Sequence, residues 1–271
     1  MTLAVVVQAR TGSSRLPGKV LLPLAGQPLL ARQLERLQAC STPFELVVAT
    51  TTGTVDDSVA VVASRAGAQV YRGHPTDLLD RHVRAARAVK ADVVVKIPSD
   101  CPLIAPAVVD HVLGAWLERG VVERLDYLGN LHPPTHPDGN DVEVTPLASL
   151  EIAWREAKRS FEREHTTPFL WDQPARFRLA NVTWETGLDY SKSHRFTIDY
   201  PEDYALISAI YDELCTPGRP VFSLDDILAL TSRRPELLAL NERHHGAGWQ
   251  DHHRHELRTF GGPNPHPETA Q

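Results

Sequence analysis

The first 120 residues alternate short apolar runs with amphipathic stretches, and this alternation constrains the fold more than any other feature. The runs at residues 3–8, 44–50, 68–71 and 92–97 are nearly continuous in apolar residues, which predicts strands buried on both faces. Apolar residues at helical spacing predict helices at 28–39, 56–66, 76–89 and 106–119. Strands of this kind, separated by helices, predict an α/β fold with a doubly wound, mostly parallel sheet.

The pattern changes after about residue 120. A loop rich in Pro and His at 131–140 precedes predicted strands at 141–144, 177–184 and 195–198 and predicted helices at 146–159 and 201–214. We expect one domain over residues 1–240, with an excursion at about 125–170 that covers the site or makes a dimer contact. Residues 241–271 are polar and rich in Pro, Gly and His without periodicity, which predicts a mostly disordered tail.

The charge and cysteine content exclude several classes of protein. A formal net charge of -6 argues against a nucleic-acid-binding surface, which normally carries a basic excess. Three widely spaced cysteines indicate neither a disulfide framework nor a zinc site. The apolar N-terminal run is too short to span a membrane and has no basic region before it. We therefore expect a cytoplasmic protein without nucleic-acid or membrane partners.

The loop after the first predicted strand, residues 9–19, contains three cations, two glycines and three hydroxyls. In open α/β sheets ligands bind beyond the carboxyl ends of the strands, where glycine-rich backbone and cations hold phosphates. The predicted nucleotide-binding residues here are Ala9, Arg10, Gly12, Ser13, Arg15 and Lys19. The loop is neither a P-loop, because Val20 replaces the required hydroxyl, nor a G-x-G-x-x-G turn.

A second loop, beginning at Pro98, places Asp100 after the fourth predicted strand, where it would face the basic loop across a crevice. Asp199 follows the predicted strand at 195–198 and precedes a helix. A helix cap explains an Asp at such a position equally simply, but Mg²⁺ takes one or two protein carboxylates and fills its other sites with phosphate and water. We predict that Asp100 and Asp199 hold Mg²⁺ and that Pro98 borders the nucleotide.

Six segments occur in an order that resembles one family: QARTGSSRLPGKVLLPLAGQPLL, VVATTTGTVDD, SDCPLI, DVEVTPLASLEIAW, EREHTTPF and RFTIDYPEDYALI. Together they resemble the cytidylyltransferases of the spore-coat polysaccharide type, relatives of the acylneuraminate and keto-deoxy-octulosonate CMP-transferases. The resemblance covers about residues 1–240 and implies a fold like that of nucleotide-diphospho-sugar transferases. By that resemblance Arg10, Ser13, Arg15 and Lys19 hold the triphosphate, while Asp100 and Asp199 match the acidic positions for Mg²⁺. The family usually has Gly where this chain has Ser99.

The resemblance implies a Mg²⁺-dependent nucleotidyltransferase that transfers CMP from CTP to a sialic-acid-like keto sugar with release of pyrophosphate, in polysaccharide biosynthesis. It also favours a homodimer. Arg15, Lys19 and Asp100 would be the catalytic residues. Asp141 and Glu143, on one face of a strand, are candidates for contacts with sugar hydroxyls, although both could form a solvated face. Arg163 and His165 are candidates for binding an acidic sugar's carboxylate.

Three charged residues occupy the loop-to-helix segment after the third strand, where they could face the ligand or form surface ion pairs: Arg72, Asp77 and Arg81.

Three other functions stay open on the sequence alone. A GTP- or UTP-dependent enzyme acting on a sugar-1-phosphate would use the same loops. A nucleotide-sugar glycosyltransferase would normally carry Asp-x-Asp where this chain has Ser99-Asp100-Cys101. A regulatory module that only binds nucleotide would not need both predicted metal ligands.

Overall fold

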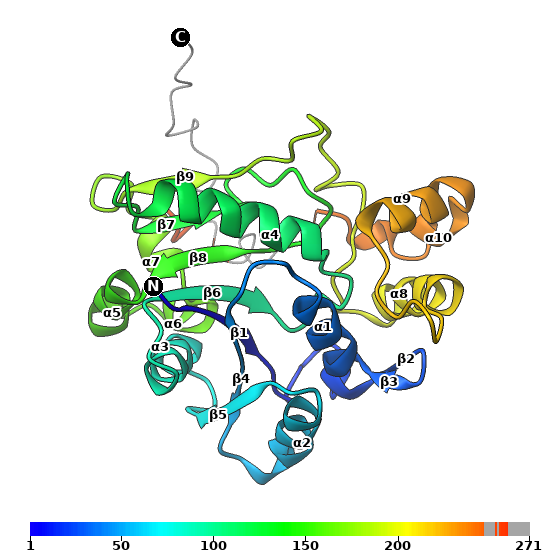
Figure 1. Cartoon of the computed structure of the whole chain (residues 1–271), viewed down its shortest axis with the longest axis horizontal. Helices are drawn as coiled ribbons and strands as arrows, with labels where there is room; N and C mark the ends of the chain where they lie inside the picture. The colour runs from blue at the N-terminus through cyan, green and yellow to red at the C-terminus, as the bar shows by residue number, and fades with distance from the viewer. Residues whose placement is uncertain (247–252, 254, 260–271) are drawn as a thin grey trace.

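A computed structural model describes residues 1–246, 253 and 255–259. A seven-stranded sheet runs through the molecule in the order β5-β4-β1-β6-β8-β7-β9 (Figure 1). Strands β1 (Leu3–Gln8), β4 (Glu45–Thr51), β5 (Gln69–Gly73) and β6 (Val93–Pro98) are mutually parallel. This arrangement confirms the predicted doubly wound α/β fold.

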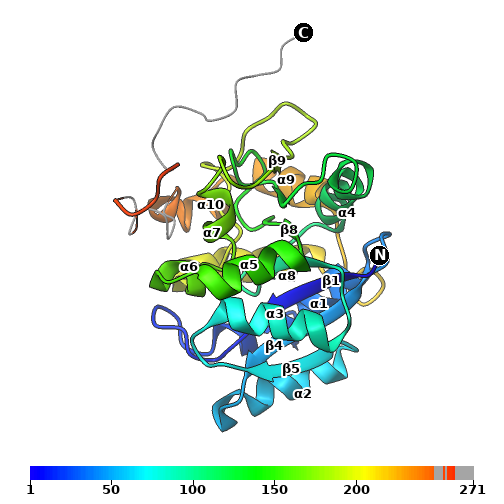
Figure 2. The ribbon, with the colours of Figure 1, turned by 90° about the vertical axis from the view of Figure 1, so that its left-hand side faces the viewer.

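Helices cover both faces of the sheet because alternate strand residues bury apolar side chains on opposite sides. Val5 and Val7 of β1 face a core shared with α1 (Leu29–Gln38), α2 (Asp57–Arg65) and α4 (Pro106–Ala115). Ala4 and Val6 face a second core shared with α3 (Leu78–Ala88) and α5 (Leu147–Glu156). Figure 2 shows α3 and α5 in front of the strands. Two-sided burial explains why the central strand β1 is apolar from Leu3 to Val7.

The second half of the chain adds the antiparallel strand β8 (Glu143–Pro146) beside β6, followed by β7 (Tyr127–Gly129) and β9 (Leu179–Asn181). The expected strand at 195–198 does not form. Phe196 N donates to Asp138 O, whereas Ile198 N donates to Asp100 O, so this stretch bonds two different loops instead of one strand. A Cβ at position 139 would lie 2.7 Å from the Phe196 carbonyl carbon, so Gly139 allows the close approach.

The expected helix at 146–159 forms as α5, which ends three residues early, and a second, unpredicted helix follows it. Helix α5 ends at Glu156, and α6 (Ser160–His165) begins after a turn in which the backbone N–H groups of Lys158 and Arg159 donate to the Glu162 carboxylate. The other elements are η1 (Lys19–Leu21), β2 (Pro23–Leu24), β3 (Gln27–Pro28), η2 (Thr54–Asp56), η3 (Trp116–Gly120), α7 (Pro168–Trp171), α8 (Pro201–Leu214), α9 (Leu224–Arg233), α10 (Glu236–Ala239) and η4 (Glu242–His244).

The C-terminal residues have more structure than their composition predicts. Asn241 is fully buried and its amide donates to Arg195 O and to the Asp203 carboxylate. Residues 255–259 pack against α6 and α7 (Figure 2). The expectation of disorder at 247–252, 254 and 260–271 falls outside the described residues. No helix in the described part of the chain is both long and apolar enough to cross a bilayer.

Candidate functional site

The basic loop and the two predicted metal ligands meet at the carboxyl ends of β1 and β6. Strands β4 and β6 lie on opposite sides of β1, so the chain turns in opposite directions from this point and leaves a crevice for a ligand. Lys19 Nζ lies 2.9 Å from an Asp100 oxygen, 3.0 Å from an Asp199 oxygen and 2.6 Å from Ile198 O. The structure therefore brings together Lys19, Asp100 and Asp199, which are separated by up to 180 positions in sequence.

Cations surround the Asp199 carboxylate on several sides. Arg15 Nη2 lies 2.7 Å from Asp199, and Arg195 Nη2 lies 3.1 Å from it. Burial alone would raise the pKa of Asp199, but the charges of Lys19, Arg15 and Arg195 outweigh it and lower the pKa. Burial also favours the neutral form of Lys19, yet Asp100 and Asp199 raise its pKa. Both partners therefore stay charged near neutral pH.

Two more carboxylates crowd the same crevice. Burial and the neighbouring Asp141 charge raise the pKa of Asp138 to about 8, although Arg195 lies 3.0 Å away. Burial, with Glu143 and Asp100, raises the pKa of Asp141 to about 6. Negative charge in this crevice is therefore only partly balanced by the cations of the protein, and an added cation would stabilise it.

The donor set fits Mg²⁺ bound through few protein ligands. Asp100 and Asp199 converge on the same ammonium group, so their oxygens lie close together. Among residues 1–246, 253 and 255–259, no three Asp, Glu, His or Cys side chains are grouped so that they could hold a metal ion by themselves. Mg²⁺ commonly uses one or two carboxylates and completes its shell with phosphate oxygens and water, which agrees with a two-carboxylate site.

The basic loop is held by Asp56. The backbone N and the Oγ1 of Thr11 donate to Asp56 at 2.7 and 2.8 Å, and Thr51 Oγ1 donates to its other oxygen. The sequence also predicts that Asp56 caps the helix at 56–66, and Asp56 does stand at the N-cap position of α2, but its carboxylate makes no capping bond. The acceptor role of Asp56 depends on Thr11, 45 positions away, and no local signal shows it.

The other residues predicted to bind the nucleotide are Ala9, Gly12, Ser13 and Pro98, and they lie where β1 and β6 end. Ala9 N donates to Ala49 O, which extends the β1–β4 pairing by one residue. Ser13 Oγ accepts from Leu16 N at 3.4 Å, and Pro98 O accepts from Gln33 Nε2 at 2.6 Å. Gly12 has open space around it, so a ligand can approach its backbone.

Arg10 points to a different part of the crevice, where it lies near Arg81 of α3. Arg10 Nη1 donates to Pro75 O at 2.9 Å. Arg81 is 1% exposed, and its Nε and Nη1 have no hydrogen-bond partner within the described residues. Burial, with the adjacent Arg10 charge, lowers the pKa of Arg81 to about 10. Arg81 therefore keeps buried donors that no group among the described residues accepts from, next to the cation of Arg10. Arg72, in contrast, pairs with Asp57 at 2.6 Å.

Glu143 is not on a solvated face. It is 3% exposed, and its carboxylate accepts from Lys96 Nζ, from Thr167 Oγ1 and, at 3.1 Å, from Tyr127 OH. Its register partner in β6 is Lys96, so the pair bridges two strands. Glu143 therefore organises this end of the crevice, and the charges of Glu143 and Asp100 both raise the pKa of Asp141.

Arg163 bonds within the protein, to Asp77 through Nε at 2.9 Å and to Trp154 O at 2.5 Å. Its proposed contact with a sugar stays a prediction. His165 lies with His82 and His132 around Lys96. Burial lowers the pKa of His82 and His165 to about 3 and that of His132 to about 4, and the Lys96 charge adds to each shift. This end of the crevice is therefore polar, with imidazoles that are neutral at pH 7.

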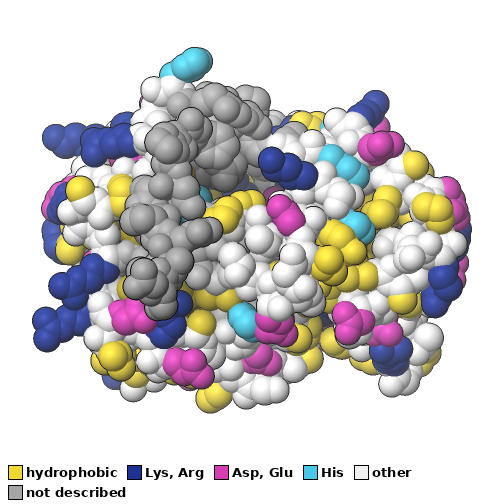
Figure 3. Space-filling model, turned by 90° about the horizontal axis from the view of Figure 1, so that it is seen from above, with side chains coloured by type: hydrophobic (Ala, Val, Ile, Leu, Met, Phe, Trp, Pro, Cys, Tyr) yellow, Lys and Arg dark blue, Asp and Glu magenta, His cyan; other side chains and the backbone are white. Residues whose placement is uncertain are grey.

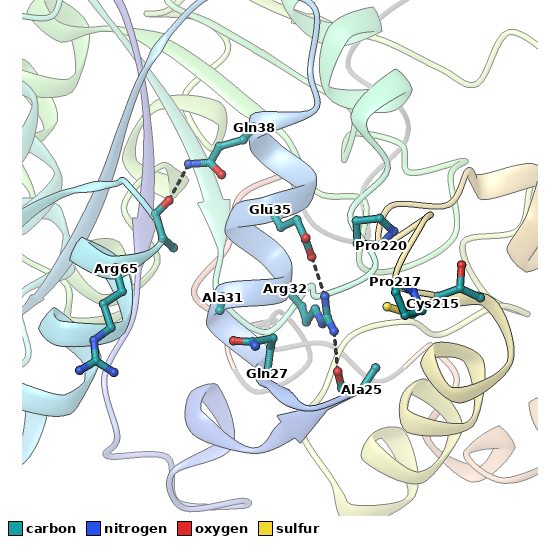
Figure 4. A pocket seen from close by; sticks show the side chains of 12 residues that line it. Ala25, Gln27, Ala31, Arg32, Glu35, Gln38, Arg65, Cys215, Pro217 and Pro220 are labelled. Carbon is teal, nitrogen blue, oxygen red and sulfur yellow. Dashed lines mark hydrogen bonds and ion pairs between the residues drawn. The ribbon is translucent and has the colours of Figure 1, made fainter.

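A separate cavity of about 580 Å³ lies between α1, the end of α2 and the loop around Cys215 (Figure 4). Arg32 donates there to Leu24 O at 3.1 Å, to Ala25 O at 2.5 Å and to Glu35 at 2.8 Å, and Gln38 donates to Ala66 O. These polar groups are satisfied within the protein. Its lining contains none of the predicted site residues, so we place the functional site at the crevice instead.

The surface has mixed charge. The face seen in Figure 3 carries both cationic and acidic side chains around its rim, with apolar side chains between them and no continuous basic stripe among the residues described there. This distribution agrees with the net charge of -6. It gives no support for a nucleic-acid-binding face.

Comparison with known proteins gives consistent matches. A family model described as cytidylyltransferase matches residues 4–223. The spore coat polysaccharide biosynthesis protein SpsF of Bacillus subtilis is 31% identical over 235 residues, which cover 85% of this chain and 94% of that protein. The 3-deoxy-manno-octulosonate cytidylyltransferase of Anaeromyxobacter dehalogenans is 41% identical over 122 residues, 44% of this chain and 48% of that protein.

Solved structures agree with these matches. A cytidylyltransferase from Leptospira borgpetersenii superposes with a TM-score of 0.82 at 31% identity, covering 88% of this chain and 97% of that one. A CMP-2-keto-3-deoxy-manno-octonic acid synthetase complexed with CTP superposes with a TM-score of 0.58 at 19% identity, covering 79% of this chain and 99% of that one. The second likeness concerns the fold alone.

Proposed function

Because the chain belongs to the cytidylyltransferase family and is thus a nucleotidyltransferase, we propose that it transfers CMP from CTP to a sialic-acid-like keto sugar with release of pyrophosphate. The single observation that carries this proposal is the meeting of Lys19 with Asp100 and Asp199 at the ends of β1 and β6. It supplies cations for phosphates and carboxylates for a metal in one crevice. The names of the relatives support CTP and an acidic keto sugar as the substrates.

Positioning of the reactants and neutralisation of the phosphate charge would account for most of the rate acceleration. The sugar hydroxyl attacks the α-phosphorus, a new P–O bond forms, the bond to the pyrophosphate oxygen breaks, and the proton of the hydroxyl passes to solvent. Lys19 and Arg15 lie beside Asp199, where they are placed to donate to oxygens of the triphosphate and leaving pyrophosphate. Mg²⁺ held by Asp100 and Asp199 would neutralise phosphate charge and polarise the reacting phosphoryl group. Arg10 would donate to the nucleotide from the other side, and the buried charge of Arg81 would add to the positive field there.

The acceptor sugar would occupy the end of the crevice formed by β6, β8 and α6. Asp141 lies there in the field of Asp100 and Glu143, while His132 and His165 supply neutral donors and acceptors for hydroxyl groups. The Lys96–Glu143 ion pair fixes the adjacent strands in register. We further propose that the enzyme acts in the cytoplasm as a homodimer in polysaccharide biosynthesis.

The test is pyrophosphate release with Mg²⁺, offering CTP, GTP, UTP and ATP against keto-acid sugars and sugar-1-phosphates. Release with CTP and a keto-acid sugar, lost in Asp100→Asn but kept in the exposed control Asp212→Asn, is the expected result. Release with GTP or UTP and a sugar-1-phosphate would overturn the substrate assignment and keep the reaction class. Transfer from a nucleotide sugar without pyrophosphate would indicate a glycosyltransferase, and nucleotide binding without any turnover a regulatory module.

A further inference from the structure

A short C-terminal segment packs over the acceptor end of the crevice. We call His253 and residues 255–259 the C-terminal strap. The strap lies beyond residue 223, where the match to the family model ends. It is therefore a feature of this chain that the family match does not explain.

The strap is anchored at a buried carboxylate. Asp172, fully buried at the end of α7, accepts from Arg258 N at 2.6 Å, Thr259 N at 2.9 Å and Thr259 Oγ1 at 3.1 Å. Arg159 Nη2 also lies 3.4 Å from Asp172. A buried carboxylate is costly unless it is hydrogen-bonded, so these bonds give the strap a defined place.

Apolar contacts hold the middle of the strap. Leu257 is 7% exposed and packs in one cluster with Tyr127, Phe161 and Trp171. Tyr127 also donates to Glu143, so the cluster adjoins the ion pair that organises the acceptor end. The strap therefore continues the wall formed by β7, α6 and α7.

His253 lies beside this wall, and its Nδ1 is 2.9 Å from a carboxylate oxygen of Glu256 in the same strap. Its ring lies 5.0 Å from the Phe161 ring and 6.4 Å from the His165 ring, measured between centroids. His165 in turn lies within the field of Lys96, the partner of Glu143. The rings of Phe161, His165 and His253 thus form a continuous series from the strap to the acceptor end of the crevice.

We propose that the C-terminal strap forms the outer wall of the acceptor-sugar pocket and that His253 contacts the bound sugar. This proposal rests on the proposed function. An imidazole can donate to or accept from sugar hydroxyls, and the neighbouring aromatic rings offer apolar faces to sugar C–H groups. The strap would therefore set which keto-acid sugar the enzyme accepts. The nucleotide end of the crevice, formed by the loops after β1 and β6, would not depend on it.

Kinetics of two shortened chains test this proposal. One ends at Gly246 and lacks the strap; the matched control ends at Thr259 and keeps it. With CTP and the keto-acid sugar that the full chain uses, loss of the strap should raise the KM for the sugar at least about tenfold and leave the KM for CTP within about twofold. An unchanged sugar KM and sugar preference in the shorter chain would overturn the proposal.

Loss of the strap exposes Asp172, so a point variant of the full chain covers the case in which the shorter chain does not fold. His253→Ala should raise the KM for the sugar about threefold to tenfold, whereas exposed His255→Ala should not. Equal effects on the KM for sugar and CTP, or no effect, would indicate a merely structural strap and overturn the assignment of His253.

A binding measurement does not require turnover. The ring resonances of His253, assigned by comparison with His253→Gln, should shift when N-acetylneuraminate or 3-deoxy-manno-octulosonate is added to the full chain. No shift with either sugar would overturn the proposal. Failure of the proposed function itself would instead appear as no pyrophosphate release by the full chain with any keto-acid sugar.

Discussion

The two ends of the crevice handle charge in different ways. At the nucleotide end, Lys19 and Arg15 lie directly against Asp199 in a partly open site, where a charged ligand can compete for each partner. At the acceptor end, Lys96 and Glu143 form a closely contacting, almost fully buried pair surrounded by neutral histidines. Under the proposed function, charge at the nucleotide end would be available to the ligand, whereas charge at the acceptor end is occupied within the protein.

The largest effect is expected from Lys19→Met. This variant removes a cation placed for the phosphates, and loss of one such donor costs about 10² to 10³-fold in rate. The rate of pyrophosphate release with CTP and the acceptor sugar, compared with that of the wild type, measures this loss. The control is Lys192→Met, an exposed lysine on a loop. A fall of less than about fivefold would show that the nucleotide end does not use its cations as the comparison requires.

The main expected effect of Glu143→Gln is a loss of stability. It leaves Lys96 buried without its counter-charge, which typically destabilises a protein by about 3–5 kcal/mol, whereas exposed Glu118→Gln should change little. Urea unfolding measures the free energy of unfolding of each variant. Adding Lys96→Met to Glu143→Gln should restore much of the loss, because no unpaired charge remains. If the double variant is as unstable as the single one, the ion pair is not the organising contact.

The neutral histidines should make the protein acid-sensitive. Burial holds the pKa of His82 at about 3, so below its ordinary value of about 6.5 the unfolded chain takes up a proton that the folded chain does not. The stability that this group contributes is complete above pH 6.5 and is lost as the pH falls, by about 1.4 kcal/mol per pH unit.

His82→Asn should therefore reduce the loss of stability between pH 6.5 and 5, measured by urea unfolding. His255→Asn, an exposed control, should not. An identical pH dependence in the wild type and His82→Asn would mean that His82 takes up a proton in the folded state as readily as in the unfolded one.

The smallest effect is expected from Arg163→Lys. Lys cannot keep the forked contact with Asp77 and Trp154 O, so stability should fall by about 1 kcal/mol while the KM for the sugar stays within about twofold. A rise in that KM of about tenfold or more would restore the role in sugar binding that the sequence predicted for Arg163. Steady-state kinetics and urea unfolding on the same preparation distinguish the two results.

The sequence predicts the nucleotide end better than the acceptor end for a physical reason. The basic loop and Asp100 each follow directly from a buried apolar strand, so the parallel sheet that the strands predict also brings the loops together. At the acceptor end, Glu143 meets Lys96 47 positions away and Thr167 24 positions away, with Tyr127 from a strand too short to be predicted. These contacts depend on packing that no local pattern encodes.

The two sequence predictions of secondary structure that the fold contradicts also fail because of contacts between distant residues. Residues 195–198 have the composition of a strand, but their backbone donors go to Asp138 and Asp100 in different loops. The segment at 255–259 is polar and unpatterned, yet Asp172 and Leu257 give it defined contacts. In each case tertiary contacts override the local preference.

The position of Asp56 has a consequence for affinity. By accepting from both Thr11 and Thr51, it joins the basic loop to the end of β4, and under the proposed function this link would limit the freedom of the loop that binds the nucleotide. Less conformational entropy is then lost on binding, and more of the contact energy between the loop and the triphosphate appears as affinity. Asp56 can thus strengthen nucleotide binding without touching the nucleotide, by reducing the freedom of the loop that does.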